Sequence, residues 1–203
     1  MVAVSQIIPT PSPQAIASYD FQDIESGLGF KDFFAAITDL TGGAEEILTD
    51  DITTYSGKIS TNRAATGTTS FTFDSSVFNL PRTVKGTAIF TCGIAGVNTA
   101  SIVAVTARLQ KWDGSTATSI SSVITSSSFS ATGAIPDKMV LLQLPLTQTI
   151  IKKGENLRLL VTFETNSNIS ADIGHDPRGR SEGSIGTNAV STMKISIPFR
   201  IDI

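Results

Sequence analysis

The sequence predicts an all-β chain that folds as an antiparallel β-sandwich with an extended N-terminal arm. Two apolar runs, residues 139–146 and 156–163, flank a charged turn that contains Gly154. Alternate residues of the later run are all apolar: Leu157, Leu159, Val161 and Phe163. Because side chains alternate across a strand, these residues share one face, and that face needs a second sheet to bury it. We therefore expect both runs to be core strands of an antiparallel sheet joined by the turn.

The first segment, residues 1–18, carries three prolines at alternate positions among small polar residues. Alternating prolines oppose both helix formation and strand pairing, so this segment is expected to be an extended arm or linker. It is interpreted either as a tail without fixed structure or as an arm that lies on a neighbouring subunit. In the second interpretation the assembly contacts are made by the apolar residues Val4, Ile7 and Ile8, together with Val2.

The next segment, residues 19–66, is the acidic end of the chain. Strands are predicted in it at residues 30–37, 47–48 and 52–55. Asp50 and Asp51 lie between the last two of these strands. Paired carboxylates can bind calcium, but this loop lacks the regularly spaced oxygen ligands of a tight site. A solvated turn without a metal ion is therefore expected.

Residues 67–203 are expected to form the sandwich domain, because apolar and polar residues alternate through them with a period of two. Besides the two apolar runs, strands are predicted at residues 71–73, 82–94, 101–112, 117–125, 171–174 and 193–203. A corner is expected at residues 79–81 and a hairpin at Asp113-Gly114. Pro198 indicates an edge or a bulge in the last strand. Eight strands in two antiparallel sheets with long crossings resemble a jelly roll.

Composition excludes several classes of function. The chain has 203 residues, a net charge of −3 and 16% charged residues, so no positive field exists to hold a nucleic-acid backbone. No run approaches the ~20 apolar residues of a membrane-spanning helix, and the N-terminus does not resemble a secretory signal. We expect a protein made in the cytoplasm that binds neither nucleic acid nor membrane. The single cysteine, Cys92, shares a strand face with Phe90 and Ile94 and is expected to be a buried, unreactive thiol.

No pattern for catalysis is present, and we expect no enzyme activity, no cofactor and no metal site. The chain has one histidine, His175, and no Gly-x-Ser-x-Gly motif, so a catalytic triad is not expected. One histidine and one cysteine are too few ligands for a zinc site, and the glycine patterns of nucleotide binding are absent. A glycosidase pair of carboxylates stays open on spacing alone. Aromatic residues, at 7% of the chain, offer little surface for stacking sugars.

The segment around the histidine has two interpretations. In the first it is a structured loop in which Asp176 accepts backbone hydrogen bonds, Pro177 fixes a turn and the arginines are solvated. In the second it contacts a partner or ligand, because exposed guanidinium groups bind the carboxylates of a neighbouring subunit or an acidic glycan. The candidate contact residues are His175, Asp176, Arg178 and Arg180.

Three segments carry a resemblance to a known class of protein: residues 19–29, the turn and strand at 152–159, and the loop at 173–177. Together they resemble the small β-sandwich structural proteins of tailed viruses, which decorate capsids or build head and tail fittings. The resemblance implies assembly without catalysis. Our first hypothesis is a virion structural protein that forms a homo-oligomer, with a trimer favoured, beside other virion proteins such as the major capsid protein. The alternative is a carbohydrate- or receptor-binding module at a viral fibre or cell surface, whose partner is a host glycan or receptor.

Overall fold

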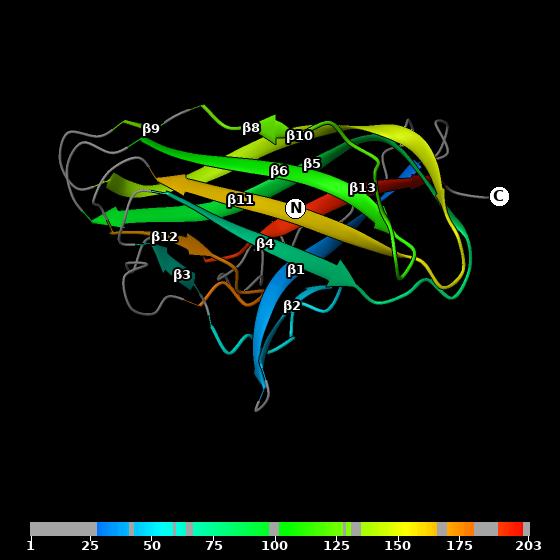
Figure 1. Ribbon diagram of the computed structural model, residues 1–203, viewed down its shortest axis with the longest axis horizontal. Helices are drawn as coiled ribbons and strands as arrows, with labels where there is room; N and C mark the ends of the chain where they lie inside the picture. The colour runs from blue at the N-terminus through cyan, green and yellow to red at the C-terminus, as the bar shows by residue number, and fades with distance from the viewer. Residues whose placement is uncertain are drawn as a thin grey trace, which may run out of the picture.

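The computed structural model describes residues 28–40, 43–58, 60–63, 67–97, 102–127, 129–130, 135–165, 170–180 and 191–200. All regular elements among these residues are β-strands, so the predicted all-β class is confirmed (Figure 1). The predicted arm at residues 1–18 lies outside the described residues. The described part of the chain contains no helix that could cross a bilayer.

The strands pack as two layers around one core. Their bounds are β1 Leu28–Leu40, β2 Gly43–Thr49, β3 Ser60–Arg63, β4 Gly67–Ser75, β5 Arg82–Val97, β6 Ile102–Trp112, β7 Ala117–Ser119, β8 Ile124–Thr125, β9 Phe129–Ser130, β10 Ile135–Ile151, β11 Asn156–Thr165, β12 Ser170–Gly174 and β13 Lys194–Arg200. One layer has the order β10-β5-β13-β1-β2, with β12 and β3 extending it beside β5. The other layer is β4-β11-β6, with β7, β8 and β9 paired to β6 (Figure 1).

The two layers are joined along both sides. On one side β2 runs parallel to β4 for two residue pairs, Ile47 with Asp74 and Leu48 with Ser75. On the other side Ser121 bridges to Leu146 of β10, and the Thr147 amide donates a hydrogen bond of 2.8 Å to the Ile120 carbonyl. The sandwich is therefore closed at both sides, and its outer faces, ends and loops are the surfaces left for function.

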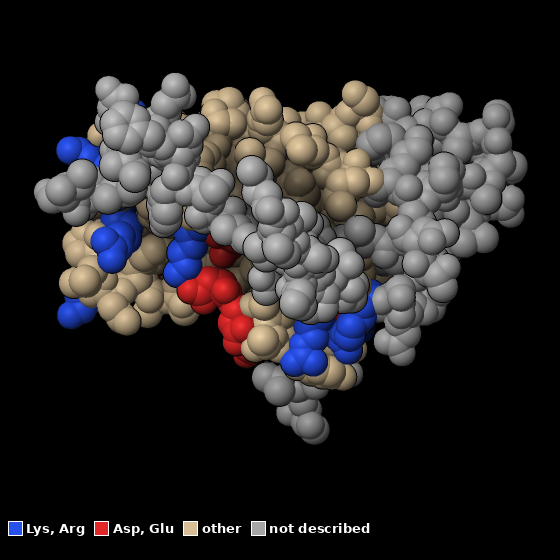
Figure 2. All heavy atoms as spheres, turned by 180° about the vertical axis from the view of Figure 1, so that it is seen from behind, with Lys and Arg blue, Asp and Glu red and all other residues tan. Residues whose placement is uncertain are grey.

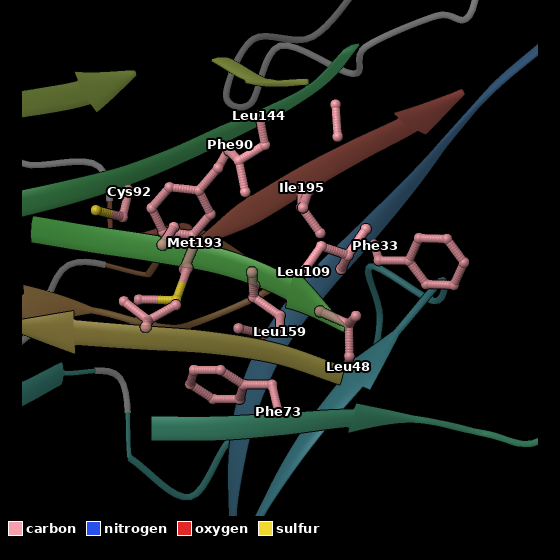
Figure 3. Packing of buried hydrophobic residues seen from close by; sticks show 14 of the residues in the cluster. Phe33, Leu48, Phe73, Phe90, Cys92, Leu109, Leu144, Leu159, Met193 and Ile195 are labelled. Carbon is pink, nitrogen blue, oxygen red and sulfur yellow. The ribbon is translucent and has the colours of Figure 1, made fainter. Parts of the chain in front are cut away.

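The core consists of the inward side chains of both layers (Figure 3). Phe90, Cys92 and Leu144 come from one layer, and Leu109 and Leu159 come from the other; all five are completely buried. They are inward because apolar residues occupy alternate positions of each strand. Cys92 is thus a buried thiol, as predicted, and burial raises its pKa.

The two apolar runs are both strands, but the expected pairing between them is wrong. β10 pairs with β5, whereas β11 pairs with β4 and β6, so the runs lie in opposite layers. The physical reason is that each run has an apolar face that needs the same core, and two layers bury both faces at once. The turn between them therefore crosses the sandwich. It is closed by Gly154 at φ +86° and by a hydrogen bond of 2.7 Å from the Lys152 amide to the Glu155 carboxylate.

The acidic N-terminal half belongs to the same sheets as the rest of the chain. β1 covers the strand predicted at 30–37 and pairs with β13 and β2. Residues 52–55 form a turn and not the expected strand, because the Asp51 carboxylate accepts hydrogen bonds from the Thr53 amide and hydroxyl at 2.8 and 2.7 Å.

In β13 the pairing with β5 shifts register between Ser196 and Phe199, which places Pro198 at a bulge, one of the two predicted outcomes.

Leu159→Ala and Leu160→Ala form a matched test of this arrangement. Leu159 is completely buried, whereas Leu160, its neighbour on β11, is half-buried on the opposite face. We expect Leu159→Ala to lower the free energy of unfolding by about 3 kcal/mol, and Leu160→Ala by about 1 kcal/mol. Chemical denaturation of both variants measures the difference, and equal losses would show that the assigned inward face of β11 is incorrect.

Candidate functional site

A pocket of about 520 Å³ opens at the end of the sandwich where β1 begins and β13 ends. Figure 1 shows these strand ends side by side at the right. The connection between β4 and β5, residues 76–82, forms the remaining wall, and the end of β2 contributes Leu48 and Asp50. Ligand pockets of proteins commonly have volumes of about 300–1,000 Å³, so this space has the size of a binding site.

The inner wall of the pocket is aromatic. The Phe199 ring lies between two others, with centroid distances of 6.3 Å to Phe33 and 6.0 Å to Phe78 and tilted geometry in both pairs. Towards solvent, Val77 and Leu80 are 56% and 63% exposed, which is unusual for large apolar side chains. The pocket therefore offers an apolar surface to a partner or ligand.

Two of the four charged side chains that line the pocket bind each other. Lys31 Nζ lies 2.5 Å from Asp50 Oδ2 and 5.4 Å from the centroid of the Phe33 ring. The hydrogen bond from Lys31 holds the pKa of Asp50 below its ordinary value. Arg82 is exposed among the lining residues. Arg200 also lines the pocket, so the lining contains three cationic side chains and one carboxylate, which suits a group with hydrogen-bond acceptors more than a metal cation.

The crossing turn between β10 and β11 positions the outer wall. The Phe78 amide donates to the Glu155 carbonyl at 2.8 Å, and the Gly154 amide donates to the Phe78 carbonyl at 2.9 Å. Lys111 Nζ then holds the Glu155 carboxylate at 3.1 Å. The charged turn that the sequence singled out therefore holds the wall of a pocket that the sequence did not predict.

The predicted contact residues around the histidine lie elsewhere, where the loop after β12 packs on residues 51–58. His175 is completely buried, its Nε2 lies 2.9 Å from the Thr61 hydroxyl, and its ring is tilted against Phe71 at 6.0 Å. Its Nδ1 has no hydrogen-bond partner among the described residues. Desolvation lowers the pKa of His175 from 6.5 to about 4, so the ring is neutral near pH 7.

Asp176 and Arg180 bind each other instead of pointing into solvent. The Asp176 carboxylate is buried. It accepts one hydrogen bond from the Arg180 amide at 2.7 Å and another from Arg180 Nε at 3.0 Å. Arg180 Nη2 also donates to the Ser56 carbonyl at 2.6 Å, and Arg178 Nε donates to the Thr53 carbonyl at 3.0 Å. The four candidates thus hold two loops together, and Arg178 alone among them is exposed. Contact of this loop with a partner stays a prediction.

This cluster does not have the geometry of a nucleophilic site. The Ser56 hydroxyl accepts from the Ile37 amide and has the carbonyl oxygens of Ile37, Lys58 and His175 as acceptors. A hydroxyl engaged by backbone in this way is not free to attack a substrate, and none of these hydrogen-bond partners is an imidazole nitrogen. Across the described residues, no group of three His, Cys, Asp or Glu side chains lies close enough to hold a metal ion.

Sequence reasoning missed the pocket because its wall was predicted only as a corner at residues 79–81. A signal was present, since Val77 and Leu80 are large apolar residues in a loop, where polar residues are usual. The other predicted site residues, Val4, Ile7 and Ile8, lie outside the described residues. Asp50 and Asp51 form the predicted turn, and their carboxylates bind Lys31 and Thr53.

Comparisons with known proteins give similarities of fold. Neither a protein-family model nor a curated protein sequence matches the chain. A CocE/NonD family hydrolase from Staphylococcus aureus is similar in structure with a TM-score of 0.50 and 12% identity, over 84% of this chain and 36% of that chain. An α-amino acid ester hydrolase has a TM-score of 0.45 and 12% identity, over 64% of this chain and 25% of that chain. A structure of infectious bursal disease virus, Gt strain, has a TM-score of 0.25 and 10% identity, over 83% of this chain and 41% of that chain. The chain spans about a third or less of either hydrolase, and the first similarity supports the sandwich fold alone.

His175→Gln is expected to change how stability depends on pH. The unfolded chain binds a proton on His175 below about pH 6.5, whereas the folded chain resists protonation until about pH 4. The stability that neutral His175 supports is therefore fully present above pH 6.5 and falls by about 3 kcal/mol as the pH drops towards 4. The difference in unfolding free energy between the native protein and His175→Gln should shrink over this range. A difference that stays constant from pH 7 to pH 4 would contradict the buried, neutral ring.

Proposed function

We propose that the protein is a non-enzymatic structural protein that acts by forming a homo-oligomer, as a capsid decoration protein or a head or tail component of a virion does. The observation that carries this proposal is an apolar row on the outer face of β10. Met139 and Leu141 are 52% and 58% exposed there, although β10 already buries Val140, Leu142 and Leu144 on its inner face. A strand that is apolar on both faces is typical of a strand covered on both sides.

The surroundings of this row extend the apolar surface. The cross-strand neighbours of Met139 and Leu141 are Gly93 and Thr91 of β5, neither of which carries a charge. Val123 is 54% exposed immediately before β8, and β8 lies beside β10 (Figure 1). We call Met139, Leu141 and Val123 the β10 strip. Exposed apolar patches of this kind mark interaction sites in soluble proteins.

A second copy of the chain is the partner that suits the β10 strip. Figure 2 shows acidic side chains in the middle of the rear face with basic ones to either side, while the tan surface at the middle of the upper edge shows no coloured charge. Identical copies have the same charge, so an uncharged strip is the part of the surface where they approach without repulsion. Thr91 and Gln143 beside it provide hydrogen-bonding groups at the rim.

The polar clusters support an assembly role over catalysis or sugar binding. The loops around β12 are held together by hydrogen bonds of Ser56, His175 and Asp176. These side chains are therefore not free to act as a nucleophile or a base. Stacking of sugars needs an open aromatic face, but Arg158 covers one face of Trp112 at 3.9 Å and Arg180 lies 5.1 Å from the Tyr55 ring. We therefore favour the assembly role, with a trimer and contact with other virion proteins as parts of the same proposal, over the glycan- or receptor-binding module.

Leu141→Lys tests the proposed interface. Placing a charge on the β10 strip of every copy should weaken association at least tenfold, which corresponds to about 1.4 kcal/mol, because like charges then meet in a desolvated contact. The melting temperature of the isolated chain should change little, since Leu141 is exposed. Light scattering or sedimentation should give the native protein a mass several times 21.4 kDa, three times for the favoured trimer.

Thr118→Lys provides the control, because Thr118 is exposed on β7 and lies outside the β10 strip. This variant should keep the native mass. A native protein that stays at 21.4 kDa at every concentration would contradict the proposed function, as would a Leu141→Lys variant that keeps the full oligomer mass.

A further inference from the structure

The pocket at the end of the sandwich has a volume of about 520 Å³ and lacks an occupant from the described residues, and apolar side chains form part of its lining. Of the large apolar side chains that the structure describes as exposed, Val77 and Leu80 belong to this pocket. They line the pocket together with buried Phe33 and half-buried Phe199, so apolar side chains lie both in its interior and at its rim. Such a surface favours an apolar segment that enters from solvent.

We propose that this pocket receives the apolar N-terminal segment, residues 2–8, of a neighbouring copy, an inference that rests on the proposed homo-oligomer. The segment contains Val2, Val4, Ile7 and Ile8, and no charged side chain occurs in residues 2–19. The segment adds no charge to a pocket in which Lys31 and Asp50 pair with each other and whose lining also contains Arg82 and Arg200. Exposed Arg82 at the wall provides donors for the carbonyl groups of an extended backbone.

The length of the preceding chain allows this contact. Residues 1–27 precede β1, and extended chain covers up to about 3.3 Å per residue, so these residues can span roughly 90 Å. A folded domain of this size has a radius of gyration of roughly 17 Å. The N-terminal segment therefore has ample length to reach the same pocket of an adjacent copy.

The direction in which the segment leaves favours a neighbour over the same chain. Gly29 and Phe30, at the start of β1, line the pocket themselves, so the preceding residues begin at its wall. Pro9, Pro11 and Pro13 favour an extended conformation between this wall and residues 2–8, and an extended segment leads away from its own pocket. A segment of one copy in the pocket of the next is a head-to-tail contact, and such contacts form a ring, for example the favoured trimer, when the rotation between copies closes.

Disulfide cross-linking between two full-length variants tests the proposal. One variant carries Ile7→Cys, or Val4→Cys as an alternative register, and the other carries Leu80→Cys. The native Cys92 is completely buried and does not compete. After mixing and mild oxidation, we expect a linked pair of twice 21.4 kDa on a non-reducing gel, because a disulfide needs Cα atoms about 5.5 Å apart. An excess of a synthetic peptide of residues 2–8 should lower the yield several-fold.

Tyr55→Cys is the matched control for Leu80→Cys, because Tyr55 belongs to neither the pocket nor the β10 strip. Its side chain is similarly exposed but lies outside the pocket, so its yield with Ile7→Cys should be several-fold lower. Equal yields with the two partners would overturn the proposal. It would also fail if the bond formed only within a single chain that carries both Ile7→Cys and Leu80→Cys, because the segment would then occupy its own pocket.

The oligomer mass separates this inference from the proposed function. If the native protein keeps its oligomer mass and no pocket-specific cross-link forms, the segment binds elsewhere and the assembly role stands. If the native protein is a monomer and no cross-link forms, both proposals fail.

Discussion

Burial of one face of every long strand against a single core is the constraint on which the rest of this molecule depends. Phe90 and Leu144 from one layer meet Leu109 and Leu159 from the other, and each of these side chains is completely removed from water. Apolar burial of this kind is the dominant favourable contribution to folding. Because β2–β4 pairing and the Ser121–Leu146 bridge also join the layers at their sides, recognition is left to outer faces, ends and loops.

The two surfaces that we assign to assembly follow from this constraint. β10 needs one apolar face for the core, yet it carries Met139 and Leu141 on the other face, where nothing in the described chain covers them. The crossing turn, forced by the placement of β10 and β11 in opposite layers, holds Phe78 through Gly154 and Glu155 and so shapes the end pocket. The polar cluster of His175, Asp176 and Arg180, by contrast, has a structural role. Its internal hydrogen bonds replace those that the polar groups of the two loops would otherwise make with water.

The period-two pattern was enough to predict the fold class and most strands, because alternation depends only on local sequence. It could not predict which strands pair, since β10 and β11 present equally good apolar faces whether they lie side by side or in opposite layers. The burial of His175 and Asp176 could not be predicted from the sequence either, because it depends on contacts with Thr61 and Arg180 that form only in the folded protein. The outward apolar residues of β10 were visible in the sequence, but only the structure shows that they are uncovered.

A second copy that covers the β10 strip would shield Met139 from solvent, and methionine oxidation measures this protection. Met139 is 52% exposed, whereas Met193 is completely buried in the core. Peroxide converts accessible methionine to the sulfoxide, which mass spectrometry locates by peptide. We expect Met139 of the native protein at high concentration to oxidise several-fold more slowly than Met139 of Leu141→Lys at the same concentration, while Met193 resists oxidation in both. Oxidation of Met139 at the same fast rate at every concentration and in both proteins would contradict the proposed contact at the β10 strip.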